Sequence, residues 1–311
     1  MRWWSPIVAW FDSWSGTDTL ADAHDRRVDW MRVVPFLAIH IACLGVIWTG
    51  FSPVAAWWAL GLYLVRIFAI TAFYHRYFSH RTFQTSRFWQ FVFAVMGNMS
   101  AQRGPLWWAA HHRHHHRHTD TEHDPHSPKQ DGFWFSHVGW ILTKKNFRTD
   151  VRLVPDLARY RELVFLDRFD SLVPVLLFAL SYGLGEFLAG WSPELRTSGW
   201  QMFVATLIST VVLFHATFTI NSLAHVWGSR PYATRDTSRN NLWLALLTLG
   251  EGWHNNHHRY QAATQQGFRW YEIDVCWYLL RGMARLGIVR GLTPVPKDVI
   301  DERSQVNSSG C

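Results

Sequence analysis

Hydrophobic and polar residues follow one another along the chain in long blocks. Predominantly apolar blocks of about twenty residues occur at about 31–50, 54–74, 171–190 and 200–224. A helix of about twenty apolar residues crosses the hydrocarbon core of a bilayer, so the pattern predicts four transmembrane spans. Only three residues separate the first two blocks and nine separate the last two. We therefore expect two antiparallel hairpins.

The polar segments that follow each hairpin predict a helical cap on one side of the membrane. They are residues 75–170 and 225–290, and neither shows strand alternation. The apolar run from Phe88 to Met96 is too short to cross a bilayer. We expect this run to form a helix that lies on the membrane or dips into it.

The chain as a whole predicts an all-α membrane protein in three parts. Residues 1–30 carry tryptophans at roughly helical spacing, which is typical of an interfacial helix, followed by a polar linker. Residues 31–290 contain the spans and the cap. Residues 291–311 form a polar tail, which we expect to be disordered from Asp301 onward.

The charge distribution predicts the orientation. The 311 residues include 30 Lys and Arg against 23 Asp and Glu, for a net charge of +7. Fourteen basic residues lie in 75–170 and ten from 225 onward, whereas 51–53 has none and 191–199 has one. The positive-inside rule then places both termini and the cap in the cytoplasm. Because the basic excess flanks membrane blocks, it argues against nucleic-acid binding, and three unpatterned cysteines suggest no disulfide framework.

One charged residue lies inside an apolar block. Arg66 is costly in a membrane unless it is paired or faces a polar cavity. Its position on the side of His75 allows a role near a functional site. A structural partner inside the bundle is the alternative, and the sequence leaves both open.

Histidines gather in separated groups. The chain has 18, and six of them lie between His111 and His118. The spacing His-x-x-His-His places three imidazoles within about 60° of arc on an α-helix. This spacing occurs as His111, His114 and His115, as His112, His115 and His116, and again as His254, His257 and His258.

Two looser features accompany these boxes. His75 and His80 are five residues apart, about 140° of α-helical turn, so the helix should bend or end between them. Asn221 and His225 are four residues apart at the end of the fourth block and can face the same centre. All these groups lie on one side of the membrane, where the spans meet the cap.

One triad from each box, together with His75, His80 and His225, gives nine imidazoles. They are too many for one four-coordinate zinc and suit two adjacent metals with room for a small exogenous molecule. Imidazole does not discriminate among transition metals. A site at the mouth of an apolar bundle suits the oxidation of an unactivated hydrocarbon chain with O₂, for which iron is the natural choice. The metal pair does this chemistry, and no side chain is assigned a catalytic role.

One known family carries such motifs in the same order and with the same membrane placement. The segments are His75–His80, His112–His116, Asn221–His225 and Gly250–His258, with Asp124–His126 and Gly132–Trp140. They are similar to those of the integral-membrane fatty acyl desaturases, specifically the acyl-CoA Δ9 (stearoyl-CoA type) branch. The similarity runs from about Ile70 to Ile288.

The resemblance implies an activity and partners. It implies a di-iron enzyme that uses O₂ and two electrons to place a cis double bond, at Δ9, in a long saturated acyl-CoA. By this resemblance we expect a bacterial-like form without a cytochrome b5 domain. We therefore expect electrons from a separate carrier, such as ferredoxin, rubredoxin or cytochrome b5 with its reductase, and a place in a bacterial cytoplasmic membrane.

The resemblance also implies site residues. Thr119-Asp120-Thr121 follows the second box as in the family and puts the ligands at His112, His115 and His116. Asn221 corresponds to a water-linked ligand. Gln102, Trp108 and Thr217 correspond to residues around the kink of the bound acyl chain. Phe218 replaces the family's tryptophan beside that threonine, which affects the shape of the tunnel and hence the preferred chain length and double-bond position.

Three alternatives remain. They are an acyl-lipid (phospholipid) desaturase, a membrane di-iron fatty acyl hydroxylase and a metal transporter. Transporters place polar ligands near the bilayer midplane, whereas these histidines lie at the ends of the spans. Among the other histidines we expect hydrogen bonding within the bundle, support within the cap or exposure to solvent. They are His40 and His215 in the bundle, His111, His114, His118, His123, His126 and His137 in the cap, and His24 in solvent.

Overall fold

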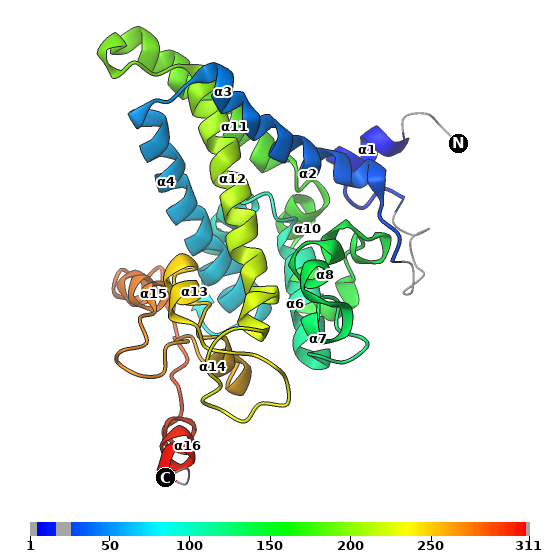
Figure 1. Cartoon of the computed structure of the whole chain (residues 1–311), viewed down its shortest axis with the longest axis vertical. Helices are drawn as coiled ribbons and strands as arrows, with labels where there is room; N and C mark the ends of the chain where they lie inside the picture. Colours follow the sequence, from blue (N-terminus) through cyan, green and yellow to red (C-terminus); the bar gives the residue numbers. More distant parts are fainter. Residues whose placement is uncertain (1–4, 17–25, 309–311) are drawn as a thin grey trace.

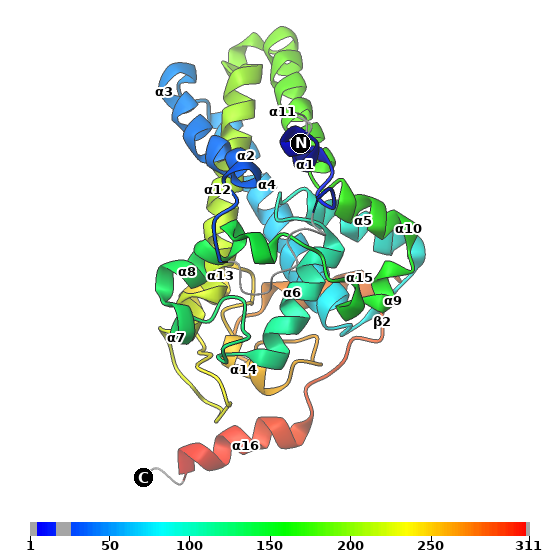
Figure 2. The same ribbon diagram turned by 90° about the vertical axis from the view of Figure 1, so that its right-hand side faces the viewer.

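The computed structural model describes residues 5–16 and 26–308. Long helices form a bundle in the upper half, and shorter helices and loops form a cap below it (Figures 1 and 2). In the described residues the sheet structure is confined to one antiparallel two-stranded pair and isolated bridges. The expected all-α architecture is confirmed.

Four helical segments are long and apolar enough to cross a membrane, as predicted. They are Trp30–Thr49, Pro53–Ser79, Leu172–Trp191 and Gly199–His225. The first consists of α2 (Trp30–Ala42), a 3₁₀ turn (Cys43–Gly45) and α3 (Val46–Thr49), and the second of α4 (Pro53–Phe68) and a π-helix (Ala69–Ser79). The third is α11 (Leu172–Trp191), and the fourth is α12 (Gly199–Asn221) with a 3₁₀ turn (Leu223–His225).

Capping residues set where these helices begin. The side chains of Ser52 and Ser198 accept hydrogen bonds from the backbone N–H groups of Ala55 and Gln201, respectively. Pro53 occupies the first turn of α4, where its missing N–H costs nothing. The connection between α11 and α12 contains a 3₁₀ turn (Pro193–Leu195). α11 and α12 pack directly against each other, whereas α2 and α4, joined by a short turn, both pack against α12. The short connections of both predicted hairpins are present.

The remaining elements flank the bundle or form the cap. Before the first span lies α1 (Ser5–Phe11). Between the hairpins lie β1 (Gln84–Thr85), α5 (Arg87–Asn98), α6 (Pro105–His118), α7 (Pro128–Asp131), α8 (Phe133–His137), 3₁₀ turns at Gly139–Leu142, Lys144–Asn146 and Val151–Leu153, α9 (Pro155–Ala158) and α10 (Arg161–Arg168). After the fourth span lie α13 (Leu242–Leu247), α14 (His254–Arg259), α15 (Val275–Arg285), β2 (Val289–Arg290) and α16 (Lys297–Ser308).

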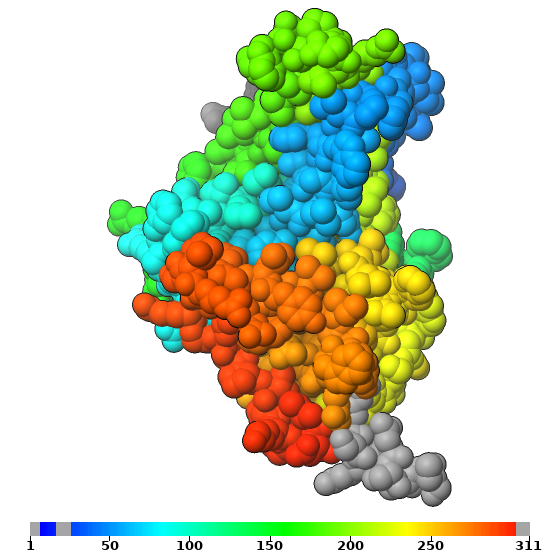
Figure 3. Space-filling model, turned by 90° about the vertical axis from the view of Figure 1, so that its left-hand side faces the viewer, coloured from blue at the N-terminus to red at the C-terminus, as the bar shows by residue number. Residues whose placement is uncertain are grey.

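The C-terminal part of the chain wraps around the cap. β2 pairs with β1 and so joins the end of the cap to its beginning. In the space-filling view of Figure 3 the yellow and orange segments cover the lower part of one face, below the blue atoms of α4. α16 forms a helix in the segment for which we expected disorder.

The second span changes its helix type before it ends. From Ala69 to Ser79 it is a π-helix, in which each N–H bonds to the carbonyl five residues earlier. The N–H of His80 accordingly donates to the carbonyl of His75 at 3.2 Å. Residues five apart therefore share a face, and the helix ends at Ser79. The helix ends between the two histidines, as expected. The wider turn of the π-helix, however, is what brings the two rings to the same face.

Arg66 has a structural role inside the bundle. Its side chain is fully buried in α4 and donates to Thr210 Oγ1 and Ser209 Oγ of α12, each at 2.7 Å. It also donates to the carbonyl of Leu62 at 3.1 Å. These contacts satisfy the guanidinium with hydroxyl and carbonyl oxygens and join α4 to α12.

The main core lies where the π-helix meets α5, α6 and α10. Phe73 and Phe93 stack with ring centroids 3.8 Å apart. Gly97 of α5 lies against the ring of Tyr74, and a Cβ at this glycine would stand 2.0 Å from that ring. The absence of a side chain therefore allows α5 to approach the π-helix.

This contact predicts a position-specific effect on stability. We expect Gly97→Ala to lower the melting temperature, because overpacking a core costs about 1–3 kcal/mol. The control is Gly61→Ala in α4, whose Cβ would meet nothing within 4 Å. That change should be neutral or stabilising by about 0.5–1 kcal/mol. Thermal unfolding of both variants in the same detergent makes the comparison, and equal melting temperatures would contradict it.

Candidate metal centre

The nine predicted imidazoles gather in two adjacent groups where the spans meet the cap. One group contains His75, His80, His112, His116 and His257, and the other contains His115, His225, His254 and His258. Within each group one ligand atom from every residue lies within 4.8 Å of all the others. The ring centroids of His116 and His258, one from each group, are 4.5 Å apart.

Two helices contribute to both groups in a reciprocal way. α6 gives His112 and His116, four residues apart on one face, to the first group and His115 to the second. α14 gives His254 and His258 to the second group and His257 to the first. The His-x-x-His-His spacing therefore supplies two imidazoles to one group and one to its neighbour.

The imidazoles converge through their Nε2 atoms. Nε2–Nε2 distances are 2.8 Å for His80–His112, 2.9 Å for His112–His116 and 3.0 Å for His116–His257. In the second group the Nε2 atoms of His225 and His254 are 3.1 Å apart. Two nitrogens bound at right angles to one cation, at about 2.1 Å each, lie about 3.0 Å apart. The spacing fits a metal ion at the centre of each group.

Acidic residues hold the opposite ring nitrogens. Nδ1 of His115 contacts Asp124 at 2.9 Å, and Nδ1 of His258 contacts Asp236 at 2.9 Å. Nδ1 of His75 lies against Glu251. A proton on Nδ1 satisfies each carboxylate and leaves the Nε2 lone pair free for a metal. Nε2 of His258 is buried without a hydrogen-bond partner, as a ligand atom would be.

Burial keeps most of these imidazoles neutral. It lowers the pKa of His80, His112, His116, His254 and His257 well below the usual range. A neutral imidazole is the form that binds a metal.

The exception is His115. Burial lowers the pKa of His115, but the carboxylates of Asp124, Asp120 and Asp236 together outweigh burial and raise it. Burial by itself would raise the pKa of Asp124, and the contact with His115 instead holds that pKa well below its usual range. The Asp124–His115 pair thus keeps a proton on Nδ1, the nitrogen that faces away from the group.

An apolar cavity reaches His112 of the first group from the bundle. It holds about 280 Å³, and its lining includes Gln102, Trp108, Thr217 and Phe218. A smaller cavity of about 40 Å³ lies next to it, and Trp108, His112, Thr217 and Asn221 line both. The two cavities therefore adjoin at the imidazoles.

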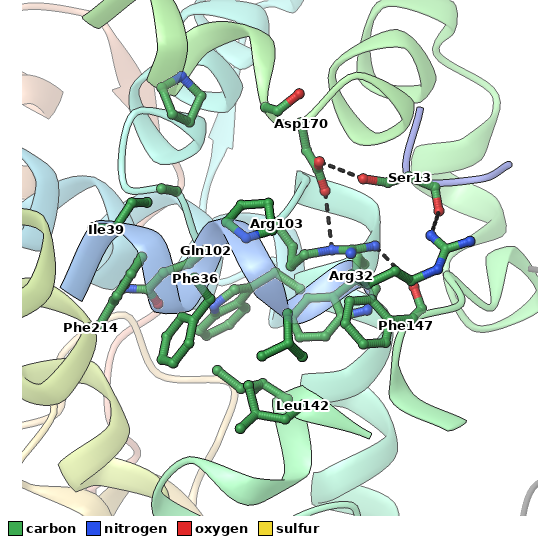
Figure 4. Close-up of a pocket in the computed structure, with 18 of the residues that line it drawn as sticks. Ser13, Arg32, Phe36, Ile39, Gln102, Arg103, Leu142, Phe147, Asp170 and Phe214 are labelled. Carbon is green, nitrogen blue, oxygen red and sulfur yellow. Dashed lines mark hydrogen bonds and ion pairs between the residues drawn. The ribbon is translucent and has the colours of Figure 1, made fainter. Parts of the chain in front are cut away.

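The residues expected around the acyl chain lie at this junction. Gln102 Nε2 donates to Thr217 Oγ1 at 3.0 Å, and this bond links the segment before α6 to α12. The ring of Trp108 stacks on the ring of His112 with centroids 4.9 Å apart. Figure 4 shows Gln102 beside Phe36, Ile39 and Phe214, which come from α2 and α12.

The other described histidines lie outside the two groups. Nδ1 of His111 donates to the carbonyl of Trp107, and Nε2 of His114 donates to that of His123, each at 2.9 Å. His40 and His215 contact each other at 3.3 Å, and His215 also contacts His137 at 3.0 Å. The expected hydrogen bonding within the bundle is confirmed. His24 lies outside the described residues.

We expected His126 to support the cap, and it also contacts the ring of a possible metal ligand. Its ring stacks on His115 with centroids 4.3 Å apart, and it also lines the larger cavity. Together with His115 and Asp124 it forms a third set of possible ligands, which shares His115 with the second group.

The sequence pattern did not assign the carboxylates that orient the imidazoles. Asp120 accepts from the backbone N–H and the hydroxyl of Thr237, and that hydroxyl contacts Nδ1 of His225 at 3.2 Å. A usable signal was present, because Asp120, Asp124 and Glu251 each lie within eight residues of a histidine box.

Comparisons with known proteins point to one family. The family model described as "Fatty acid desaturase" matches residues 21–290. The chain is 37% identical to "Delta-9 acyl-lipid desaturase 1" of Arabidopsis thaliana, over 85% of this chain and 83% of that protein. It is 34% identical to "Acyl-CoA 5-desaturase AL21" of Anemone leveillei, over 93% and 89%. It is 35% identical to "sn-1 stearoyl-lipid 9-desaturase" of Anabaena variabilis, over 87% and 96%.

Adjacent histidines of α6 provide a matched test of the two groups. We expect His115→Ala to lose at least one of two bound metals per chain, because His115 belongs to the second group. His114→Ala should keep both, since its ring bonds to a carbonyl. Metal analysis of the purified variants measures this. Equal losses in the two variants would contradict the assignment.

Proposed function

Because this chain belongs to the fatty acid desaturase family, we propose that it introduces a cis double bond, at Δ9, into a long saturated acyl chain. The reaction consumes O₂, two electrons and two protons, removes two hydrogens from neighbouring methylenes and releases two waters. One observation carries the proposal: an apolar cavity among the spans ends at two groups of five and four imidazoles.

The two groups are proposed to hold two irons. The ligands would be His75, His80, His112, His116 and His257 for one iron, and His115, His225, His254 and His258 for the other, with Asn221 acting through a water. When bound, the irons supply the oxidation of an unactivated methylene by O₂. Burial keeps water away from the two groups, and the carboxylates hold imidazoles in the orientation that binds a metal. Both features support the proposal that each group holds an iron.

The cavity is proposed to set the position of the double bond. Trp108 lies flat against His112, so it can press the acyl chain toward the metals. The bond between Gln102 and Thr217 ties the two sides of the junction together. Phe218, fully buried beside them, would shape the turn that the chain takes. These residues bind and orient the substrate, which fixes which carbons meet the metals.

Two acyl carriers are candidates. The motifs resemble those of acyl-CoA desaturases, and relatives with either carrier in their names are similar to this chain. A specific observation favours a membrane lipid. Arg103 and Arg32 line the cavity and are already paired, Arg103 with Asp170 at 3.1 Å and Arg32 with Asp29 at 3.4 Å. No lysine lines it, so the lining offers little to the phosphates of CoA.

The membrane setting follows from the same proposal. We place residues 31–290 in the desaturase domain, with the cap and both termini in the cytoplasm of a bacterial cell. A separate carrier such as ferredoxin, rubredoxin or cytochrome b5 with its reductase would then deliver electrons from that side.

Expression in a host that lacks unsaturated acyl chains tests the activity. We expect new cis-monoenes with the wild-type protein and none with His116→Ala, because that change removes an imidazole from the first group. Mass spectrometry of the host lipids, with localisation of the double bond, measures this. A hydroxy acid would instead indicate hydroxylation, and altered metal content with unchanged lipids would indicate transport.

The role of Trp108 has its own test. We expect Trp108→Ala to lower turnover about tenfold or more and to scatter the double-bond position, because a loosely held chain presents several carbons to the metals. Trp134→Ala is the control, since that side chain is 74% exposed on the cap. Unchanged position and turnover in Trp108→Ala would remove Trp108 from the site.

A further inference from the structure

Three helices supply part of the wall of the larger cavity. Its lining includes Phe36 and Ile39 of α2, Val175 and Phe178 of α11, and Trp10 of α1. Figures 1 and 2 place α1 beside the beginning of α2. α1 therefore covers a part of the cavity whose wall is also formed by the first and third spans.

The two faces of α1 differ in what they contact. Ala9 and Trp10 face the cavity. Ile7, Val8 and Phe11 face outward, with exposures of 44%, 45% and 57%. In a protein that spans a membrane, such an outward apolar face rests in the lipid. Any chain that passes beneath α1 therefore comes from the bilayer.

Polar contacts hold the turn after α1 to the connection between α10 and α11. Asp12 forms an ion pair with Arg168, with oxygen–nitrogen distances of 2.6 and 3.0 Å. The backbone N–H of Ser13 donates to the carbonyl of Arg168 at 2.8 Å, and its hydroxyl donates to Asp170 at 2.5 Å. Figure 4 shows the hydrogen bond between Ser13 and Asp170 at the edge of the cavity.

These contacts have the character of a latch. The side chain of Arg168 is 49% exposed, and an ion pair in contact with solvent is weak. The pair and the Ser13 contacts lie at the C-terminal end of α1, and the indole N–H of Trp10 donates to the carbonyl of Met31 at 2.6 Å. Opening α1 at its N-terminal end therefore breaks the Trp10–Met31 bond and the Asp12–Arg168 pair. Trp14, whose indole N–H donates to Asp167 at 2.9 Å, stays in place as the hinge.

We propose that α1 is a lid over the acyl cavity, latched by Asp12 and Arg168, which opens to admit acyl chains sideways from the bilayer between α2 and α11. This proposal rests on the proposed function, because it takes the cavity to be the acyl site. It assigns the N-terminal helix a role in substrate access beyond anchoring the chain at the membrane surface.

Uptake of an acyl probe tests the lid without requiring turnover. The full-length, metal-loaded protein in lipid nanodiscs is mixed with a fluorescent long-chain polyene fatty acid. Energy transfer from tryptophan then reports a fast phase of partition into the bilayer and a slower phase of entry into the protein. Excess stearoyl lipid, added as a competitor, should abolish the slower phase.

Breaking the latch should accelerate entry. We expect Asp12→Asn and Arg168→Gln each to speed the slower phase about two- to fivefold, the factor that an exposed ion pair contributes to an equilibrium. The double variant should be no faster than either single one, because both changes remove the same pair. Arg168→Lys keeps the charge and should restore the wild-type rate.

The matched control breaks another exposed ion pair of α10, the helix that carries Arg168. Arg87 of α5 binds Glu162 of α10 at 2.7 and 2.8 Å, and neither lines the cavity. Arg87→Gln should leave the slower phase unchanged. An equal acceleration in Arg87→Gln, or wild-type rates in Asp12→Asn and Arg168→Gln at unchanged melting temperature, would overturn the lid.

The readout separates the two proposals. Accelerated entry in the latch variants without any monoene in the host lipids would support the lid and contradict the proposed desaturation. Monoene formation with unchanged entry in the latch variants would support the proposed desaturation and contradict the lid.

Discussion

Nine imidazoles packed against one another are the constraint on which the structure depends. Neutral rings whose Nδ1 protons point outward leave only lone pairs facing inward, and lone pairs at about 3 Å repel one another unless a cation lies between them. Every element that supplies a ring must therefore be held in place by contacts outside the groups. The carboxylates on His75, His115 and His258, and the ion pair of Arg76 with Asp274 at 3.0 Å, provide such contacts.

The membrane bundle and the cap meet this constraint together. The second and fourth spans run past the apolar blocks to carry His75 and His225 to the same level. Two cap helices bring their histidines to the same level. They are α6, which lies between the second and third spans, and α14, which follows the fourth span. The same arrangement leaves an apolar cavity between spans that ends at the imidazoles, so a lipid-soluble chain and a metal pair can meet without exposing either to bulk water.

Much of this arrangement was readable from the sequence. The four spans, the two hairpins and the nine histidines follow from block length and from the spacing of a single residue type, both of which are local properties. The register of the second box, His112 rather than His111, came only from resemblance, and the structure turns His111 and His114 toward carbonyls instead.

Other features depend on contacts between distant segments and were not readable. The π-helix that aligns His75 with His80 is set by packing against α5 and α6, whereas periodicity arguments assume α-helical geometry. The partners of Arg66 lie more than 140 residues away in α12, so its structural role could not be separated from a functional one. The contact of α1 with the α10–α11 connection likewise joins residues far apart in the sequence.

X-ray absorption at the iron edge tests the central claim most directly. The two groups predict two irons per chain, each surrounded by four to five nitrogen ligands at about 2.0–2.2 Å. A single metal per chain, or a shell dominated by oxygen or sulfur, would contradict the account.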